Sequence, residues 1–275
     1  MEDKSKAWRE VFEFPVRGRS AKPRNTGLTM LIDKGLGLTE TRDLLQLASD
    51  YIDFIKLTFG TSAFYSTQLL KEKIALVRSY GIQIFPGGTF LELALIQGKL
   101  DKYLARGKEL GFDAIEVSDG TITMSDEVRR RTIQQALEQG FQVITEVGKK
   151  DPSEKVPQSR ILNLIHSDLE CGAFKVIVEG RESGKGVVIY DHEGNVDRNE
   201  LEGLASGVAS VRNLLWEAPL KNQQQSLILR FGPDVNLGNI HPEDILALEA
   251  LRVGLRGDTL KVSLRGYSGM ALPGS

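Results

Sequence analysis

The chain has 275 residues, with 35 basic and 37 acidic side chains and a net charge of −2. This near balance gives no general reason to expect nucleic acid or an anionic membrane as a partner. No apolar stretch approaches the roughly 20 residues that span a bilayer, and the first 25 residues contain no apolar signal core. The single cysteine, Cys171, cannot form an internal disulfide, so we expect a cytoplasmic protein.

Eight short apolar runs, most of them ending in a charged or polar residue, follow one another along the chain. They cover residues 29–33, 51–58, 82–85, 112–118, 141–147, 174–179, 213–217 and 227–231. Helical patterns lie between or after them at residues 39–51, 66–81, 125–140, 153–172 and 242–254. Residues 91–111 predict two helices broken at Gly98, and residues 183–212 predict a long loop or small hairpin before a helix.

Strand-length runs that alternate with helices predict βαβ units and a parallel sheet, and eight units are the number that closes a (β/α)8 TIM barrel. One barrel of about 250 residues uses nearly the whole chain. We therefore expect an α/β protein with a single domain: a barrel over residues 26–256, an N-terminal extension at 1–25 and a C-terminal tail at 257–275. The charged strand ends then lie at the catalytic mouth of the barrel.

Three glutamates stand near the ends of consecutive predicted strands. Glu116, Glu146 and Glu179 are 30 and 33 residues apart, about one βα unit each. Because side chains alternate along a strand, all three can face the barrel interior and converge there. Carboxylates that close repel one another unless a cation lies between them, and all-oxygen ligation without histidine favours Mg²⁺. The alternative is that each glutamate pairs with a Lys or Arg at the rim.

Cations gather at the same level of the barrel. Lys56 and Arg230 lie in predicted strands two and eight, Lys149 and Lys150 follow strand five, and Arg181 follows strand six. We interpret Lys150 as a solvated rim lysine and Lys149 as the better candidate to contact substrate. The two arginines present forked donors that suit phosphate oxygens.

The segment GPDVNLGNI at residues 232–240 predicts a phosphate-binding loop. Its Gly232, Asn236 and Gly238 offer backbone N–H groups, and barrels often bind phosphate after strands seven and eight. Gly, Asn and Pro also make ordinary turns, so the motif is weak on its own.

Four further polar residues stand at strand ends. Asp33 and Glu217 end strands one and seven, and we expect them to position Lys56 or an arginine. Ser118 and Asp119 follow the fourth strand and are candidate substrate-binding residues, with turn formation in VSDGT as the alternative.

Eight strings spanning residues 28–240 carry a resemblance to a known family. They are TMLIDKGLG, DFIKLTFGTS, FPGGTFLELA, AIEVSDGT, VITEVGKK, EGRESGKGVVIYD, LLWEAP and FGPDVNLGNI. In these strings the chain resembles the phosphosulfolactate synthase family. The resemblance implies a (β/α)8 barrel that adds sulfite to phosphoenolpyruvate with Mg²⁺ and gives (2R)-phospho-3-sulfolactate. It also implies a role in sulfolactate formation or, in methanogens, in coenzyme M biosynthesis.

The residues at the strand ends suit that reaction. Sulfite attack at C3 of phosphoenolpyruvate moves negative charge onto C2 and the carboxylate, an enolate-like intermediate that Mg²⁺ stabilises in related chemistry. C2 must then gain a proton. By geometry and by resemblance the candidate acid is Lys149, with Lys56 as its competitor, and Glu116 completes the predicted catalytic set.

Two other functions remain open at this point. General barrel features also allow another phosphate-handling lyase or isomerase. Plant heat-stress-associated proteins share the family's sequence pattern, so a non-catalytic, stress-related protein is the second alternative. For the synthase, the expected partners are phosphoenolpyruvate and sulfite, and the family resemblance together with the basic N-terminal segment predicts a homo-oligomer.

Overall fold

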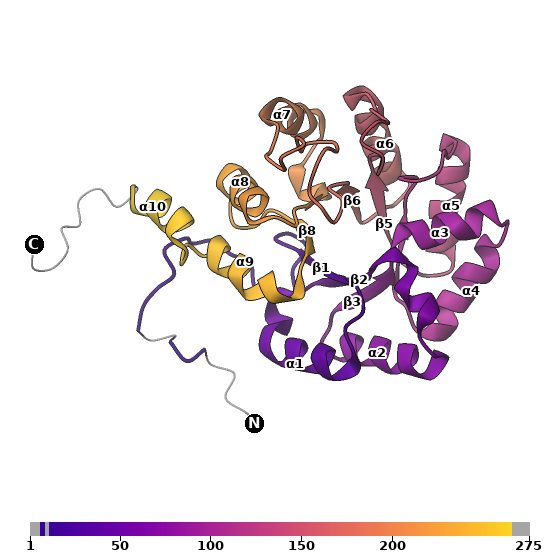
Figure 1. The fold of residues 1–275 in the computed structure, drawn as a ribbon, viewed down its shortest axis with the longest axis horizontal. Coiled ribbons are helices and arrows are strands. Elements are labelled where there is room, and N and C mark those ends of the chain that lie inside the picture. Colours follow the sequence, from indigo (N-terminus) through magenta and orange to yellow (C-terminus); the bar gives the residue numbers. More distant parts are fainter. Residues whose placement is uncertain (1–5, 9–10, 266–275) are drawn as a thin grey trace, which may run out of the picture.

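Eight strands alternate with helices along the chain and pair side by side into a barrel (Figure 1). The computed structural model describes residues 6–8 and 11–265. The strands are β1 (Thr29–Asp33), β2 (Phe54–Leu57), β3 (Gln83–Pro86), β4 (Ala114–Val117), β5 (Gln142–Val147), β6 (Lys175–Val178), β7 (Leu214–Glu217) and β8 (Leu237–Ile240). They pair in parallel in the order β3-β2-β1-β8-β7-β6-β5-β4, and β3 lies beside β4, so the barrel is nearly closed. The predicted (β/α)8 TIM barrel is confirmed.

Helices cover the outside of this barrel (Figure 1). They are α1 (Leu38–Ala48), α2 (Thr67–Ser79), α3 (Gly88–Ile96), α4 (Leu100–Leu110), α5 (Asp126–Glu138), α6 (Gln158–Glu170), α7 (Arg198–Gly207), α8 (Lys221–Phe231), α9 (Ile245–Arg252) and α10 (Gly257–Arg265). Short 3₁₀ turns are η1 (Ser49–Tyr51), η2 (Thr58–Phe64), η3 (Val211–Asn213) and η4 (Pro242–Asp244). The predicted break at Gly98 separates α3 from α4, and a bridge between Tyr190 and Val196 lies in the predicted long loop before α7. Among the described helices, none has the length and apolar character needed to cross a bilayer.

Two segments that the sequence predicts at the chain ends are described in part. Residues 1–5 and 9–10 of the N-terminal extension, and residues 266–275 of the C-terminal tail, lie outside the described residues. The tail begins with α10.

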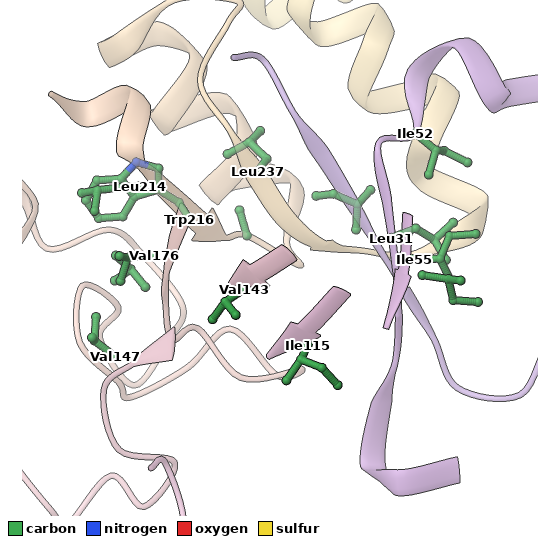
Figure 2. Close-up of a cluster of buried hydrophobic side chains, with 14 of the residues drawn as sticks. Leu31, Ile52, Ile55, Ile115, Val143, Val147, Val176, Leu214, Trp216 and Leu237 are labelled. Atoms are coloured by element: carbon green, nitrogen blue, oxygen red, sulfur yellow. The ribbon is translucent and has the colours of Figure 1, made fainter. Parts of the chain in front are cut away.

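Alternation of side chains along the strands produces an inner and an outer apolar layer. The inner cluster, enclosed by the strands, contains Leu28, Met30, Phe54, Phe85, Ala114, Ile144, Ile177 and Leu215. The outer cluster, between strands and helices, includes Leu31, Ile55, Ile115, Val143, Val176, Leu214, Trp216 and Leu237 (Figure 2). Because Ile144 and Ile177 face inward, Glu146 and Glu179, each two residues further along, also face inward. The alternation therefore directs polar strand-end residues into the mouth.

The prediction for strand eight is wrong. Residues 227–231 form the last turns of α8, in which Leu227 and Ile228 are buried while Leu229 and Arg230 are exposed. A short apolar run does not distinguish a strand from a buried stretch of helix, which explains the error. The eighth strand is Leu237–Ile240, inside the segment predicted to be a phosphate-binding loop. Its sequence, LGNI, contains Gly and Asn, which are depleted in strands.

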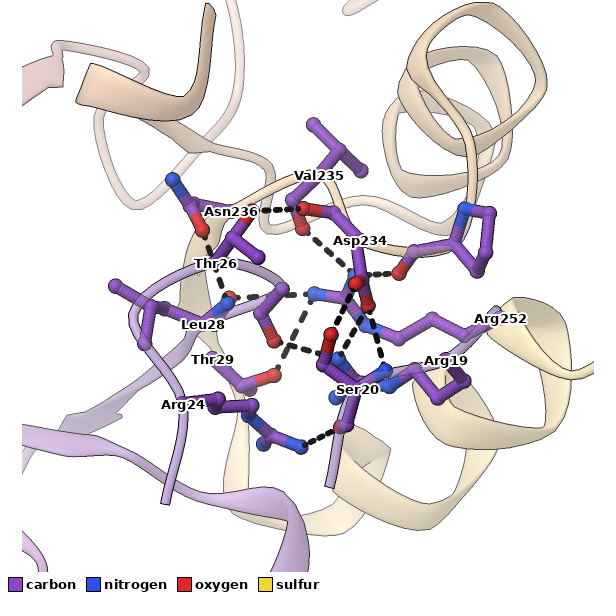
Figure 3. Close-up of polar contacts among 12 residues, drawn as sticks. Arg19, Ser20, Arg24, Thr26, Leu28, Thr29, Asp234, Val235, Asn236 and Arg252 are labelled. Atoms are coloured by element: carbon purple, nitrogen blue, oxygen red, sulfur yellow. Dashed lines mark hydrogen bonds and ion pairs between the residues drawn. The ribbon is translucent and has the colours of Figure 1, made fainter. Parts of the chain in front are cut away.

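The N-terminal segment is fastened to the end of the barrel opposite the mouth, where β1 begins (Figure 3). Arg19 forms ion pairs with Glu249 on α9 (2.9 Å) and with Asp234 before β8 (3.2 Å). Arg24 pairs with Asp53 before β2 at 2.8 Å. These side chains are largely buried, so residues 19–24 of the extension lie over the barrel as part of its closed end.

Gly238 in β8 marks a close approach inside the barrel. A Cβ atom at this position would overlap the Leu215 side chain and lie 2.7 Å from Cε of Met30. We expect Gly238→Ala to lower the free energy of unfolding by about 1–3 kcal/mol, the usual cost of overpacking. Gly257→Ala is the matched control, because a Cβ there meets no heavy atom within 4 Å. Denaturant midpoints of both variants test this; equal midpoints for Gly238→Ala and the wild type would contradict the packing argument.

Candidate active site

A cavity of about 270 Å³ opens at the mouth of the barrel. Its lining includes Lys56, Glu116, Lys150, Glu179, Arg181, Glu217 and Asn239. These residues come from β2, β4, β7, β8 and the segments that follow β5 and β6. Side chains far apart in sequence therefore meet at the end of the barrel where this architecture carries its active sites.

Four glutamates converge at this mouth, and all are almost completely buried. Glu116 and Glu146 belong to β4 and β5, Glu179 follows β6, and Glu217 ends β7. The predicted inward direction of the first three is confirmed, since Lys56 or Lys150 contacts each of them. Glu217 joins them and contacts Lys56, one of the two kinds of partner predicted for it.

Lys56 lies at the centre of these carboxylates. Its Nζ is 2.8 Å from Oε2 of Glu116, 3.0 Å from Oε2 of Glu146 and 3.2 Å from Oε1 of Glu217. Burial alone lowers the pKa of Lys56, but the surrounding carboxylates outweigh this and raise its pKa well above the usual range. Lys56 therefore stays an ammonium group that holds the glutamates together.

The two adjacent lysines after β5 point in different directions. Nζ of Lys150 lies 2.8 Å from Oε1 of Glu146 and 3.1 Å from Oε2 of Glu179, and Lys150 lines the mouth cavity. Nζ of Lys149 donates instead to backbone oxygens of the loop after β4, and Lys149 lines a separate cavity of about 280 Å³ between the loops after β5 and β6. The interpretation of Lys150 as a solvated rim lysine is therefore wrong.

The pKa values of the glutamates at the mouth differ from one another, because burial, neighbouring carboxylates and the two lysines act on them to different extents. Burial raises the pKa of Glu116 to about 7, although Lys56 partly opposes the shift. The pKa of Glu179 is raised well above its usual range by burial and by the charges of Glu146 and Glu217. Burial acts in the same direction on Glu146, but Lys150 and Lys56 outweigh it and lower its pKa. Without a further cation, the site therefore holds some of its carboxyl groups protonated near neutral pH.

Three of the glutamates form a set that fits a metal ion. Glu146, Glu179 and Glu217 each place one carboxylate oxygen within 4.8 Å of the others. Oε2 of Glu179 is buried and forms an ion pair with Lys150 but no hydrogen bond with the described residues. An all-oxygen set of this kind suits a hard cation such as Mg²⁺. Glu116, predicted as a ligand, is outside this set: its Oε1 accepts a hydrogen bond from the Gly88 N–H at 2.7 Å.

Strained backbone surrounds the cavity. Phe59, Arg181 and Asn239 line it and have positive φ angles of 56°, 59° and 53°. Such conformations cost energy in residues other than glycine and collect at functional sites. The guanidinium group of Arg181 forms no ion pair with the described residues, so it is available to an anion.

Three predicted site residues serve as anchors beside the cavity. Ser118 donates to Oε1 of Glu92 at 2.6 Å, and Asp119 accepts from Arg129 at 3.0 Å. Asp33 pairs with Lys73 at 2.5 Å and accepts the N–H groups of residues 35 and 36. None of the three lines the mouth cavity.

The predicted phosphate loop does not assemble at the mouth. Gly232 follows α8, and Asn236 lies at the opposite end of the barrel, where its Oδ1 accepts the N–H of Leu28 (Figure 3). Gly238 is packed inside β8. Arg230 is exposed on α8 and pairs with Glu202, because the segment that carries it is helical.

Sequence reasoning missed two residues of this region. Asn239 lines the cavity next to the predicted Gly238, and its position was hidden by the short, irregular sequence of β8. Glu92 is buried on α3 and accepts three hydrogen bonds from the loop after β4. A single charged residue inside the apolar run FLELALI was the available signal for it.

The raised pKa of Glu116 predicts a measurable stability effect. A carboxyl group with a folded pKa of about 7 and an ordinary value of 4.5 stabilises the fold below pH 4.5, and this contribution is lost as the pH rises through 7. Glu116→Gln keeps the acceptor for Gly88 but cannot ionise. Without metal, we expect the variant to match the wild type at pH 4 and to exceed it by about 3 kcal/mol at pH 8. Denaturant unfolding at both pH values tests this; parallel pH profiles would contradict it.

Comparisons with known proteins agree with this geometry. A model of the (2R)-phospho-3-sulfolactate synthase (ComA) family matches residues 17–258. The chain is 45% identical over 258 residues to the phosphosulfolactate synthase of Methanothermobacter thermautotrophicus, covering 92% of this chain and 99% of the relative. It is 48% identical over 236 residues to that of Methanocaldococcus jannaschii, covering 85% and 93%. The solved structure of the YdjI aldolase from Escherichia coli K12, at 12% identity, has a TM-score of 0.53 over 89% of this chain and 91% of its own, which shows the shared fold alone. The chain therefore belongs to the (2R)-phospho-3-sulfolactate synthase (ComA) family.

Proposed function

We propose that this protein is a Mg²⁺-dependent lyase that adds sulfite to phosphoenolpyruvate and forms (2R)-phospho-3-sulfolactate. The observation that supports this most is the buried group of four glutamates with Lys56 and Lys150 at the barrel mouth. Membership of the synthase family supplies the reaction.

The charges at the mouth suit two anionic substrates once a divalent cation is present. Four glutamates face Lys56, Lys150 and Arg181. A bound Mg²⁺ would keep the four carboxylates ionised and leave the local charge positive. Glu146, Glu179 and Glu217 would hold the ion, and it would supply a Lewis acid for the substrate carboxylate.

The chain's own groups bind the anions and deliver the proton. Sulfur of sulfite forms a bond to C3 of phosphoenolpyruvate, and the electrons of the C2–C3 double bond move to C2. The guanidinium of Arg181, which forms no ion pair with the described residues, is suited to hold phosphate or sulfite oxygens in a bidentate manner. Lys150 is the proton donor to C2, because its ammonium reaches the cavity while Lys149 points elsewhere. Lys56 remains the second candidate, although it is already held by three carboxylates.

The proposal extends to the location of the protein, its oligomeric state and the use of its product. We place it in the cytoplasm, where a single free thiol such as Cys171 stays reduced. Exposed apolar side chains on η2 and α3, among them Phe64 and Ile96, support a homo-oligomer. The product would serve sulfolactate formation or coenzyme M biosynthesis.

Phosphoenolpyruvate consumption, measured with and without sulfite and with and without Mg²⁺, tests the function. We expect turnover only when both are present, with one phosphosulfolactate formed per phosphoenolpyruvate consumed. Turnover without sulfite would favour another barrel lyase or isomerase, and no turnover under any of the four conditions would favour a non-catalytic relative. Arg181→Met should raise KM for the anions, and Arg230→Met, on the exposed face of α8, is its matched control.

A further inference from the structure

We propose that Lys149 is a positioning residue that fixes the loop after β4, residues 118–125, and through this loop holds Lys150 in place. The inference rests on the proposed function, in which Lys150 donates a proton. It gives Lys149 a role different from the acid predicted from the sequence.

Lys149 binds the backbone of the loop and not the substrate cavity. Its Nζ donates to the backbone oxygens of Asp119 and Ile122, each at 2.6 Å, and lies 3.8 Å from Oδ2 of Asp119. The Lys149 side chain is 15% exposed. Two short bonds from a largely buried ammonium to carbonyl oxygens three residues apart hold the loop as a tight turn.

Other buried groups anchor the same loop. The carboxylate of Glu92 accepts the N–H groups of Thr121 and Ile122 at 3.0 and 3.1 Å. Arg129, paired with Asp168, also donates to the backbone oxygen of Glu146 at 2.9 Å. Arg129 also donates to Oδ1 of Asp119 at 3.0 Å, so it joins the loop after β4 to the end of β5.

The loop lies directly against Lys150. The N–H of Lys150 donates to the backbone oxygen of Gly120 at 3.0 Å. A Cβ atom on Gly120 would lie 3.1 Å from Cγ and 3.3 Å from Nζ of Lys150. The backbone at Gly120 therefore packs along the side chain of Lys150. If this backbone moved, the Lys150 side chain could move its ammonium away from Glu146 and Glu179. A misplacement of about 1 Å is enough to lower the rate about 100-fold.

A positioning role and an acid role for Lys149 predict different activities for the same variant. Arginine can donate to both carbonyl oxygens but cannot transfer a proton, because the guanidinium group is not deprotonated in proteins. Lys149→Arg should therefore preserve activity if Lys149 positions the loop, and abolish it if Lys149 is the acid. Lys149→Met removes both capacities. Lys155→Met, an exposed lysine of the same loop after β5, is the matched control.

The test combines hydrogen exchange of the peptide spanning residues 118–125, measured without substrate, with steady-state kinetics. For Lys149→Met we expect exchange about tenfold faster and kcat about 10–100-fold lower with KM changed less than about threefold. Lys149→Arg should restore both, and Lys155→Met should match the wild type. Unchanged exchange in Lys149→Met, or a Lys149→Arg variant that is inactive with normal exchange, would overturn the proposal. The exchange result tests whether Lys149 fixes the loop, whether or not the wild type is active. Absence of sulfite-dependent turnover in the wild type would overturn the proposed function and not the role of Lys149 in the loop.

Discussion

The Lys150→Met variant is expected to lose about a thousandfold in kcat for sulfite-dependent consumption of phosphoenolpyruvate. General acids contribute about 10²–10⁴-fold, and Lys150 is the residue whose ammonium lies between Glu146 and Glu179 in the cavity. Burial lowers the pKa of Lys150, but Glu146 and Glu179 outweigh burial and raise this pKa above its usual range. A metal ion bound to these glutamates would repel the ammonium and lower the pKa again, which makes Lys150 a better acid. Initial rates at saturating sulfite and Mg²⁺ measure the effect.

Two comparisons separate this role from a loss of charge or of folding. Lys150→Arg keeps a cation near Glu146 and Glu179 but supplies no transferable proton, so it should be as inactive as Lys150→Met. Thermal unfolding should show that both variants remain folded. If Lys150→Arg keeps more than about a tenth of the wild-type kcat, the proton donor is a different group, and Lys56 becomes the first candidate.

Glu179→Gln is expected to weaken Mg²⁺ binding by about 100-fold or more. Loss of an outer partner of a metal site already costs about 10–100-fold, and Glu179 supplies an oxygen to the group that fits the ion. Calorimetric titration with Mg²⁺, or Mn²⁺ binding followed by paramagnetic resonance, measures the affinity without reference to turnover. Glu116→Gln is the matched control, because Glu116 lies outside the group; it should bind the ion within a few fold of the wild type.

The affinity for Mg²⁺ measured in this titration should depend on pH. Because the pKa of Glu179 is raised well above its usual range, this carboxyl holds a proton near neutral pH when no metal is present. A metal ligand must be deprotonated, so binding should release a proton and the affinity should rise with pH. Glu179→Gln should abolish the release. Equal proton release in the variant and the wild type would exclude Glu179 as the group that loses the proton.

Seven of the eight strands and the inward direction of Glu116, Glu146 and Glu179 are predictable from the sequence. Each of these strands is a short apolar run, and the alternation of side chains along it is a property of the strand itself. Two residues along the strand from an inward-facing Ile144, Glu146 must face inward as well. The prediction of carboxylates at the mouth needs no knowledge of the neighbouring strands.

The eighth strand shows where this reasoning ends. LILRF has the apolar character of a strand but continues the helical sequence that begins at Lys221, and its burial follows the helix period. The true strand, LGNI, is held by its neighbours β7 and β1 and by tight packing at Gly238. For this reason the sequence predicts Arg230 and Asn236 at the mouth, whereas Arg230 lies on the exposed face of α8 and Asn236 lies at the opposite end of the barrel.

The barrel and the direction of its strand-end carboxylates are properties of local sequence, since the strand and helix periods depend on neighbouring residues. The partners of those carboxylates are not. Lys56 meets Glu217 across 161 positions of the chain, and no local pattern records that contact. Gly148 has a φ of 116°, so the alternation of β5 stops there, Lys149 turns to the loop after β4 and Lys150 turns to the glutamates. Which of two adjacent lysines enters the site therefore depends on backbone geometry and on the carbonyl oxygens of another loop, which exist as partners only in the folded chain.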